Sequence, residues 1–381
     1  MKTPSRVAAD LQGAARLATE GSLALVRLVE AMHARIQRPL PGPANERTRG
    51  LTGLVYRGVH GVTRGVGMST TALLGLLPEA VERGPRSPRR DAVVAALNGV
   101  LGDHLAATGN PLAQRMQLCC DGEPLVLTRG ALAARFPSAS QGVLVLLHGL
   151  CMNDRQWRRK GHDHGAELGA ALGLTPLYLR YNSGLPVTEN GRQFAALMAT
   201  LLRVWPHAAP RVVLLAHSMG GLVARSALHK APRAAWTRRV SDLVCLGTPH
   251  FGAPLEKAGR GVDLLLDAAP YAAPLARLGK VRSAGITDLR HGLDADVGLP
   301  PGPRCWAIAG LLGEGDGKGA RGLAPHVLGD GLVRLNSALG RHRDPARRLP
   351  FPEAHQWVAE GVGHLDLLSS RAVARQLRAW L

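Results

Sequence analysis

The stretch LLAHSMGGLVARSAL, residues 214–228, decides the fold: an apolar strand pattern runs directly into Ser218, and a helical pattern follows at once. A sharp turn between a strand and a helix lifts a serine out of the sheet and exposes its hydroxyl, as in a nucleophile elbow. The two backbones nearly touch at such a turn, so the residues two before and two after the serine must be small. Gly220 meets this requirement, and Ala216 departs from the usual glycine by one methyl group. The stretch predicts a nucleophilic serine, with an ordinary strand-to-helix turn as the alternative that the pentapeptide alone leaves open.

Strand and helix patterns alternate around this elbow, from about residue 113 to the C-terminus. Helical patterns at 191–204 and 219–229 separate several apolar runs typical of buried strands, which lie at 143–147, 177–181, 212–215, 243–246 and 306–312. Asp121-Gly122, between two further apolar runs, predicts a hairpin. The alternation predicts an α/β fold, a mostly parallel sheet with helices on both faces, whose chemistry lies at the carboxyl ends of the strands.

The segment VLVLLHGLCMNDRQW, residues 143–157, ends its strand with His148-Gly149 and suits an oxyanion hole. Such a hole needs two backbone N–H groups that point to where negative charge develops. We expect these from Leu150, in the turn after the strand, and from Met219, the residue after the predicted nucleophile. The segment 180–194 is expected to wall the site, with Asn182 as a polar contact to the substrate.

The acid and the base of a catalytic triad are predicted further along the chain. Asp330 lies between two glycines in GDGLVRLNSALG, residues 329–340, and His364 follows the last expected strand in QWVAEGVGHLDLL, residues 356–368. The order Ser218, Asp330, His364 matches the order of one specific fold and excludes the orders of the two well-known protease folds.

Two other carboxylates are alternatives for the acid. Asp316 lies in GEGDGKGA, residues 313–320, nearer to the end of the preceding strand. Asp366 is only two residues from His364, and so local a neighbour is more often a charge at a helix N-terminus. We rank Asp316 second, after Asp330.

Residues 1–112 are expected to form a helical region that precedes an α/β domain at 113–381. Apolar residues recur at helical spacing in three segments, 15–37, 51–67 and 91–105. A helical layer packed on the main domain or on a partner is one interpretation, and an element that lies on a membrane surface is the other. A helical insertion at about 253–300 is expected either to act as a cap or lid over the site or to pack as ordinary core helices.

The composition favours a folded intracellular protein. Hydrophobic residues make up 46% of the chain and charged residues 20%, which excludes global disorder. The net charge of +19 is spread along the chain and aromatic residues make up only 4%, so no nucleic-acid partner is expected. Five cysteines without a CxxC pair predict neither a zinc site nor a disulfide framework. With no secretory signal and no membrane-spanning run evident, we expect a cytoplasmic protein, soluble or peripheral to a membrane, that uses no metal or cofactor.

These motifs carry a resemblance. Residues 113–381 resemble the α/β-hydrolase superfamily and, within it, bacterial lipases and esterases, including triacylglycerol-lipase-like and GPI-inositol-deacylase-like proteins. The resemblance rests on the AHSMG elbow, the segment CLGTPHFGAP at 245–254 and the DGLV segment that begins at Asp330. The helical N-terminal region and the stretch RSAGITDLRHG, residues 282–292, are similar to those of further bacterial members.

The resemblance implies a serine carboxylic-ester hydrolase that acts on an apolar or lipid-like acyl ester. Ser218 matches the nucleophile, Asp330 the acid and His364 the base, while Leu150 and Met219 match the oxyanion donors. The serine would form an acyl-enzyme that water then opens. Two alternatives stay open: an acyltransferase that passes the same acyl group to an alcohol, and a catalytically dead scaffold associated with a membrane.

Overall fold

The chain divides into two compact units. The computed structural model describes residues 6–37, 50–75, 87–137, 142–207, 210–253, 283–294, 296–312 and 329–381. One unit comprises Met1–Arg86 with Leu105–Ala113, and the other comprises Ser87–His104 with Gln114–Leu381. This division differs from the expected boundary at residue 112, because most of helix α3 (Pro88–Ala107) groups with the second unit.

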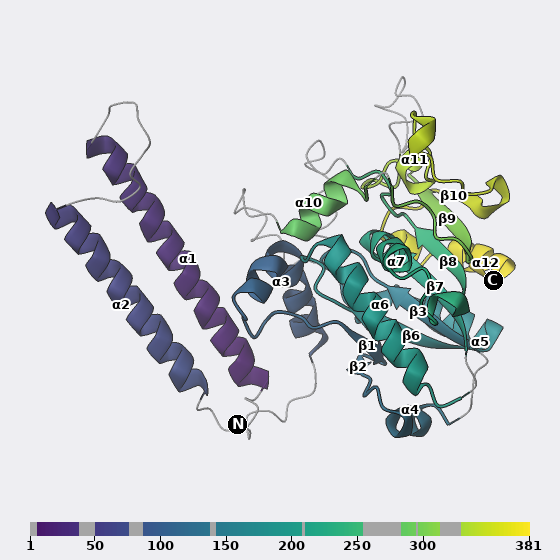
Figure 1. Ribbon diagram of the computed structural model, residues 1–381, viewed down its shortest axis with the longest axis horizontal. Coiled ribbons are helices and arrows are strands. Elements are labelled where there is room, and N and C mark those ends of the chain that lie inside the picture. The colour runs from purple at the N-terminus through teal and green to yellow at the C-terminus, as the bar shows by residue number, and fades with distance from the viewer. Residues whose placement is uncertain are drawn as a thin grey trace. The chain divides into compact units, whose positions relative to one another are not determined.

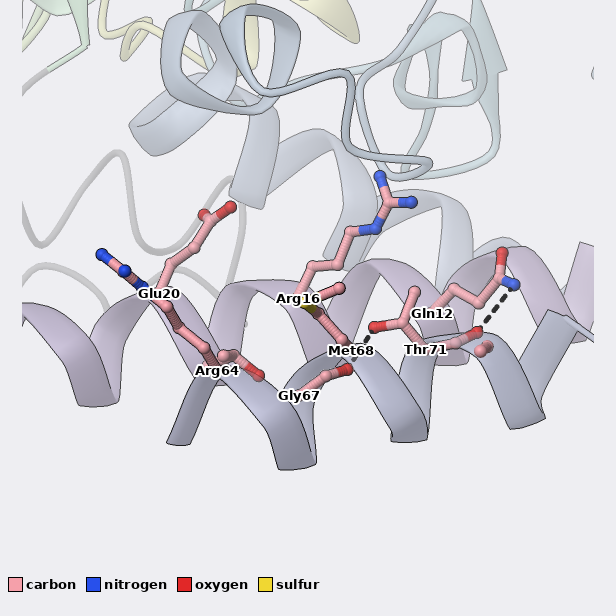
Figure 2. A pocket seen from close by; sticks show the side chains of 9 residues that line it. Gln12, Arg16, Glu20, Arg64, Gly67, Met68 and Thr71 are labelled. Carbon is pink, nitrogen blue, oxygen red and sulfur yellow. Dashed lines mark hydrogen bonds between the residues drawn. The ribbon is translucent and has the colours of Figure 1, made fainter. Parts of the chain in front are cut away.

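Two long helices build the first unit, α1 (Arg6–Gln37) and α2 (Gly50–Gly75), and they lie side by side (Figure 1). They approach closely where Gly67 meets Thr19, since a Cβ added at Gly67 would overlap the threonine side chain. A groove of about 600 Å³ runs along them, and Figure 2 shows that polar and apolar side chains line it together. No described helix combines the length and the apolar character needed to cross a bilayer.

The second unit is organised around a sheet. Within the described residues it has eight strands, in the order β10-β9-β8-β7-β3-β6-β1-β2. The parallel strands are β3 (Gly142–Leu147), β6 (Leu174–Arg180), β7 (Arg211–His217), β8 (Val240–Leu246), β9 (Arg304–Leu311) and β10 (Gln356–Glu360). An antiparallel edge is formed by β1 (Gln117–Cys120) and β2 (Glu123–Pro124), and a separate ribbon by β4 (Arg158–Arg159) and β5 (His162–Asp163).

The strands expected from apolar runs are all present, with ends that differ from the expected ones by at most three residues. The expected hairpin joins β1 and β2. Asp121 and Gly122 at its turn have φ values of 53° and 76°, as a tight hairpin turn of this hand requires.

Side chains alternate between the two faces of the sheet along each strand, and on both faces they are apolar. Helices cover both faces and bury these side chains. In β3, Val145 packs into one hydrophobic core, and its neighbours Leu144 and Leu146 pack into the other. The first core is covered by α3, α4 (Arg129–Arg135), α6 (Val187–Val204), α7 (Met219–Lys230), α10 (Ala284–His291) and α11 (Leu335–Ala338). The second core is covered by α5 (His164–Leu172) and α12 (Arg371–Trp380). Single-turn helices complete the connections: η2 (Asp154–Trp157), η3 (Thr237–Arg239), η4 (Pro345–Arg347), η5 (Glu353–His355) and η6 (Asp366–Leu368).

Most of the expected cap at 253–300 lies outside the described residues, which leave out 254–282 and residue 295. Of the remainder, α10 packs against the first core through Leu289. The alternative acid Asp316 also lies outside the described residues.

Candidate active site

Ser218 lies in the turn between β7 and α7, in a backbone conformation that L-amino acids rarely adopt. Its φ is 55° and its ψ is −123°, and residues held in such regions typically cost about 1–3 kcal/mol. The Ser218 N–H donates to the Leu246 carbonyl at 2.8 Å, which ties the turn to the end of β8. A Cβ added at Gly220 would lie 2.5 Å from the Leu147 carbonyl oxygen, so α7 and β3 leave room only for glycine. This is the close approach that the sequence pattern around the serine predicts.

Asp330 and His364 form a buried pair. His364 Nδ1 lies 2.7 Å from Asp330 Oδ2, and both residues are almost fully buried. The second carboxylate oxygen of Asp330 accepts the backbone N–H groups of Leu332 and Val333, at 3.0 and 2.8 Å. The backbone N–H of His364 also donates to the backbone carbonyl of Asp330 at 2.9 Å. A carboxylate held by backbone donors fixes the imidazole with Nδ1 as donor, which leaves Nε2 as the acceptor of the neutral ring.

Loops at the carboxyl ends of neighbouring strands bring this pair beside the serine. A Cβ added at Gly247 would lie 3.0 Å from Asp330 Oδ2 and 3.1 Å from His364 Nδ1. Gly247 directly follows Leu246, whose carbonyl accepts the Ser218 N–H. The pair and the serine therefore pack around the same loop after β8. Sequence reasoning did not single out Gly247; its place in the CLGTPHFGAP segment was the only signal.

His217, the residue before the serine, links the elbow to the loop that carries His364. Its Nε2 lies 3.0 Å from the His364 carbonyl oxygen, and the centroids of the two rings are 4.7 Å apart. Burial lowers the pKa of His217 well below its usual 6.5, and the neighbouring His364 lowers that pKa further. A neutral His217 donates its Nε2–H to that carbonyl.

The turn after β3 also contacts the elbow that carries Ser218. A Cβ added at Gly149 would lie 3.1 Å from Ser218 Cβ, so the two turns are in contact there. Burial lowers the pKa of His148 to about 3, and its carbonyl accepts the Tyr181 hydroxyl at 2.8 Å, which gives His148 a structural role. Leu150 follows in this turn and is buried.

Met219 is the first residue of α7, where helix geometry leaves the backbone N–H without an intrahelical acceptor. The two residues expected to supply oxyanion donors, Leu150 and Met219, therefore follow the two turns that touch at Ser218.

Asn182, the expected polar contact to substrate, uses its side chain inside the fold. Its Nδ2 donates to the Gly102 carbonyl at 2.8 Å, and its Oδ1 accepts the Gly184 N–H at 3.0 Å. Only 2% of the residue is exposed. These contacts join the loop after β6 to α3, so we leave Asn182 out of the site that we propose.

Asp366, the other described alternative for the acid, pairs at the surface with Lys160 Nζ at 2.6 Å. Among the residues that the structure describes, no three His, Cys, Asp or Glu side chains are grouped so that they could hold a metal ion.

Comparison with known proteins gives matches in one protein family and among solved structures. A family model described as a PGAP1-like alpha/beta domain matches residues 192–293, which run from α6 through the elbow to α10. No curated protein sequence matches the chain.

Three similar structures illustrate the solved relatives. Lipase BlEst2 from Bacillus licheniformis, in its mature form, is 19% identical, with 69% of this chain and 98% of that chain covered and a TM-score of 0.43. Carboxylesterase NP, the naproxen esterase of Bacillus subtilis, is 14% identical over 64% of this chain and 85% of its own, with a TM-score of 0.41. Phospholipase PlaB from Legionella pneumophila is 15% identical over 52% and 46%, with a TM-score of 0.36.

The parallel sheet, its strand order, the elbow after β7 and the helices on both faces define an α/β hydrolase fold. The fold class and the resemblance predicted from the sequence are thus confirmed. Within that class, the central part of the chain is similar to the PGAP1-like alpha/beta domain.

Proposed function

We propose that the protein is a serine carboxylic-ester hydrolase that acts on an apolar or lipid-like acyl ester. The observation that carries the proposal is the 2.7 Å contact between His364 and Asp330, buried beside a strained serine elbow. Asp330 has both carboxylate oxygens occupied, one by the imidazole and one by backbone N–H groups. This arrangement suits an acid that orients an imidazole and stabilises its positive charge.

In the proposed first step, the Ser218 oxygen attacks the ester carbonyl carbon while His364 Nε2 takes the hydroxyl proton. The carbonyl π electrons move to oxygen, and the N–H groups of Leu150 and Met219 stabilise the oxyanion. The tetrahedral intermediate then expels the alcohol, which takes the proton back from His364. Asp330 stays ionised throughout and holds the imidazole by its Nδ1–H.

In the second step, water loses a proton to His364 and attacks the acyl-enzyme. The acid leaves and Ser218 recovers its proton. An alcohol in place of water would give acyl transfer by the same chemistry, so the acyltransferase alternative differs only in the acceptor.

The proposal is tested by labelling the full chain with a fluorophosphonate probe and by assaying p-nitrophenyl esters from acetate to palmitate. We expect labelling and hydrolysis that are lost in Ser218→Ala. They should be kept in Ser226→Ala, a change at another buried serine of α7. An unlabelled, inactive but folded protein would favour the scaffold alternative, and exclusive cleavage of short acyl groups would overturn the lipid-like preference. Formation of a new ester from an added alcohol, faster than hydrolysis to the free acid, would favour acyl transfer.

A peripheral attachment to anionic membranes is proposed for the first unit, because α2 has an exposed apolar side. The side chains concerned are 41–68% exposed: Leu54, Val55, Val59, Val62 and Val66. At about 100° per residue, four of them (Val55, Val59, Val62 and Val66) fall within a sector of roughly 60°.

The charges of α2 are on its other side. Arg57 and Arg64 lie roughly 140° or more from the sector of the four valines at the same helical spacing. A helix with an apolar face and basic residues opposite suits the interface of a bilayer. The net charge of +19 would add attraction to anionic lipids.

A reducing compartment such as the cytoplasm is proposed from the cysteines. All five are free, and four of them are buried. Free cysteines are typical of proteins that are not exposed to an oxidising environment.

A further inference from the structure

The turn that carries the proposed oxyanion donor Leu150 contains a second strained residue. Cys151 has a φ of 60°, in the left-handed region that residues with a side chain rarely adopt. Its N–H donates to Ser183 Oγ at 3.0 Å. Burial raises the pKa of its thiol to about 12, so Cys151 is not a nucleophile and its role is one of packing.

Helix α3 packs directly against Cys151. A Cβ added at Gly99 would overlap Cys151 Sγ and would lie 2.9 Å from both its backbone N and its Cα. The helix backbone and the turn backbone are therefore in contact, without room for one methyl group. Because Cys151 is bonded to Leu150, a displacement at Gly99 is transmitted to the adjacent peptide.

Polar contacts at residues 99–103 hold α3 in this position. The Gly99 carbonyl accepts the Ser283 hydroxyl at 2.6 Å, and the Gly102 carbonyl accepts the Asn182 amide at 2.8 Å. Asp103 accepts the Ala284 N–H at 2.8 Å.

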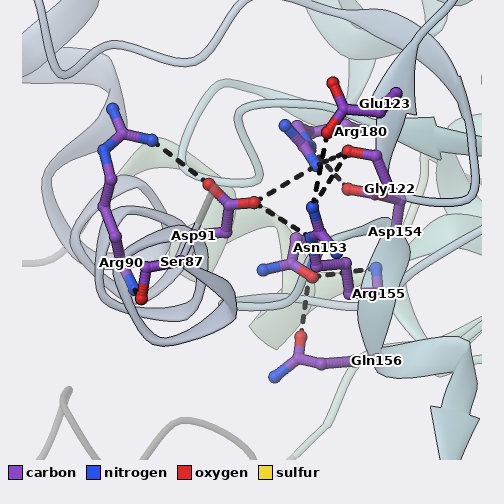
Figure 3. A network of polar contacts seen from close by, with 10 residues as sticks. All are labelled: Ser87, Arg90, Asp91, Gly122, Glu123, Asn153, Asp154, Arg155, Gln156 and Arg180. Carbon is purple, nitrogen blue, oxygen red and sulfur yellow. Dashed lines mark hydrogen bonds and ion pairs between the residues drawn. The ribbon is translucent and has the colours of Figure 1, made fainter. Parts of the chain in front are cut away.

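The N-terminal end of α3 forms ion pairs with the segment that follows the Leu150–Cys151 turn (Figure 3). Asp91, which is 3% exposed, lies 3.0 Å from Arg155 Nε and 3.6 Å from Arg180 Nη2. Arg155 belongs to η2 and also donates to the Gly122 carbonyl at 3.2 Å. Thus α3 contacts both ends of the segment from Cys151 to Arg155.

We propose that α3 is a positioning element for the oxyanion hole, with Gly99 and Asp91 as its positioning residues. The inference rests on the proposed function, because it assigns α3 a task in stabilising the oxyanion. A methyl group at Gly99 displaces Cys151 and with it the Leu150 N–H. This lowers the rate of the chemical step and leaves the serine, the base and the acid in place.

The test compares Gly99→Ala with Gly130→Ala in the full chain. Gly130 is also helical, but an added Cβ there meets nothing within 4 Å. The fluorophosphonate probe titrates competent sites, so that kcat is expressed per labelled site and any unfolded fraction is removed. For Gly99→Ala we expect kcat to fall by about tenfold to a hundredfold. Its KM and the pH profile of kcat/KM should stay unchanged, and Gly130→Ala should behave as the wild type.

Two further variants keep the test decisive if Gly99→Ala does not fold. Asp91→Asn keeps the shape of the side chain and removes its charge, and it should lower kcat per labelled site. Asp121→Asn, which breaks an exposed pair with Arg135, should not. Adding Cys151→Gly to Gly99→Ala removes the overlapping thiol and the left-handed strain, and it should restore part of kcat.

An activity-independent readout separates this inference from the proposed function. The amide NMR resonances of Leu150 and Cys151 should shift in Gly99→Ala and not in Gly130→Ala, whether or not the protein cleaves esters. An inactive, unlabelled wild type would refute the hydrolase. Unshifted amides, or a kcat per labelled site equal to that of the wild type in both Gly99→Ala and Asp91→Asn, would refute the positioning role.

Discussion

Gly247→Ala offers the sharpest test of how the loop after β8 supports the acid and the base. The new Cβ would lie 2.8 Å from Leu367 Cδ1, 3.0 Å from Asp330 Oδ2 and 3.1 Å from His364 Nδ1. These separations are shorter than ordinary van der Waals contact by several tenths of an ångström. The pair must therefore move, and small misplacements of reacting groups cost up to about 100-fold in rate.

A second effect of the same substitution has to be separated from the first. Gly247 has a φ of 56°, and a residue with a Cβ in this region costs roughly 1–2 kcal/mol of stability. Gly173→Ala is the matched control, because Gly173 has a φ of 62° and an added Cβ there meets nothing within 4 Å. Both variants should lose a similar amount of stability from backbone strain, with a further loss in Gly247→Ala from the crowding.

The assay is steady-state hydrolysis of a p-nitrophenyl ester, together with thermal unfolding. We expect kcat of Gly247→Ala to fall at least about tenfold, which corresponds to about 1.4 kcal/mol in the barrier. Gly173→Ala should keep the wild-type kcat, although its melting temperature falls. Equal kcat values in the two variants would refute the reasoning, since the contact with the pair would then have no consequence for catalysis.

Three further predictions concern the acid, the buried His148 and the first unit. Asp330→Asn should lower kcat by roughly 10⁴-fold, because the amide favours the wrong tautomer of the imidazole. Asp316→Asn should leave kcat unchanged. A loss of kcat in Asp316→Asn and not in Asp330→Asn would make Asp316 the acid. The pKa of His148 is about 3 in the folded protein and about 6.5 in the unfolded chain. Between these two pH values, His148 binds a proton only in the unfolded chain. The contribution of neutral His148 to the free energy of unfolding is therefore fully present above pH 6.5. It falls by roughly 2–3 kcal/mol between pH 6.5 and 4.5. Denaturant titrations over this window should show a shallower pH dependence in His148→Gln, and an unaltered slope would contradict the assignment. Val62→Glu should weaken co-sedimentation of the full chain with vesicles that contain phosphatidylserine, while Val126→Glu, at a valine of nearly equal exposure (65% against 68%), should not. Vesicle binding that survives Val62→Glu would refute the membrane face, and a loss of self-association instead would make it an interface between copies of the chain.

Much of the second unit could be predicted from the sequence because its signals are local. Strands such as β7 are short, continuous apolar runs, and burial on both faces of a parallel sheet produces that pattern directly. The elbow at Ser218 is equally local, since the small residues around it answer contacts made within one turn. The candidates Asp330 and His364 follow from their places after successive strands, because parallel strands bring their carboxyl ends to one edge.

Tertiary structure decided what depends on contacts between distant parts of the chain. The apolar residues of α3 do not state which core the helix joins. Its grouping with the second unit follows from partners such as Asn182 and Ser283, which lie 80 and 184 residues away from the α3 residues that they contact. The expected role of Asn182 at the substrate was reasonable for a polar residue near a strand end, yet its amide is used to bind α3. Gly247 and Gly99 look like any other glycines in the sequence, because the atoms that exclude their side chains come from other elements of the fold. Sequence periodicity records whether a residue is buried, but it does not record against which atoms, and in this chain those neighbours decide how the serine, the acid and the base are supported.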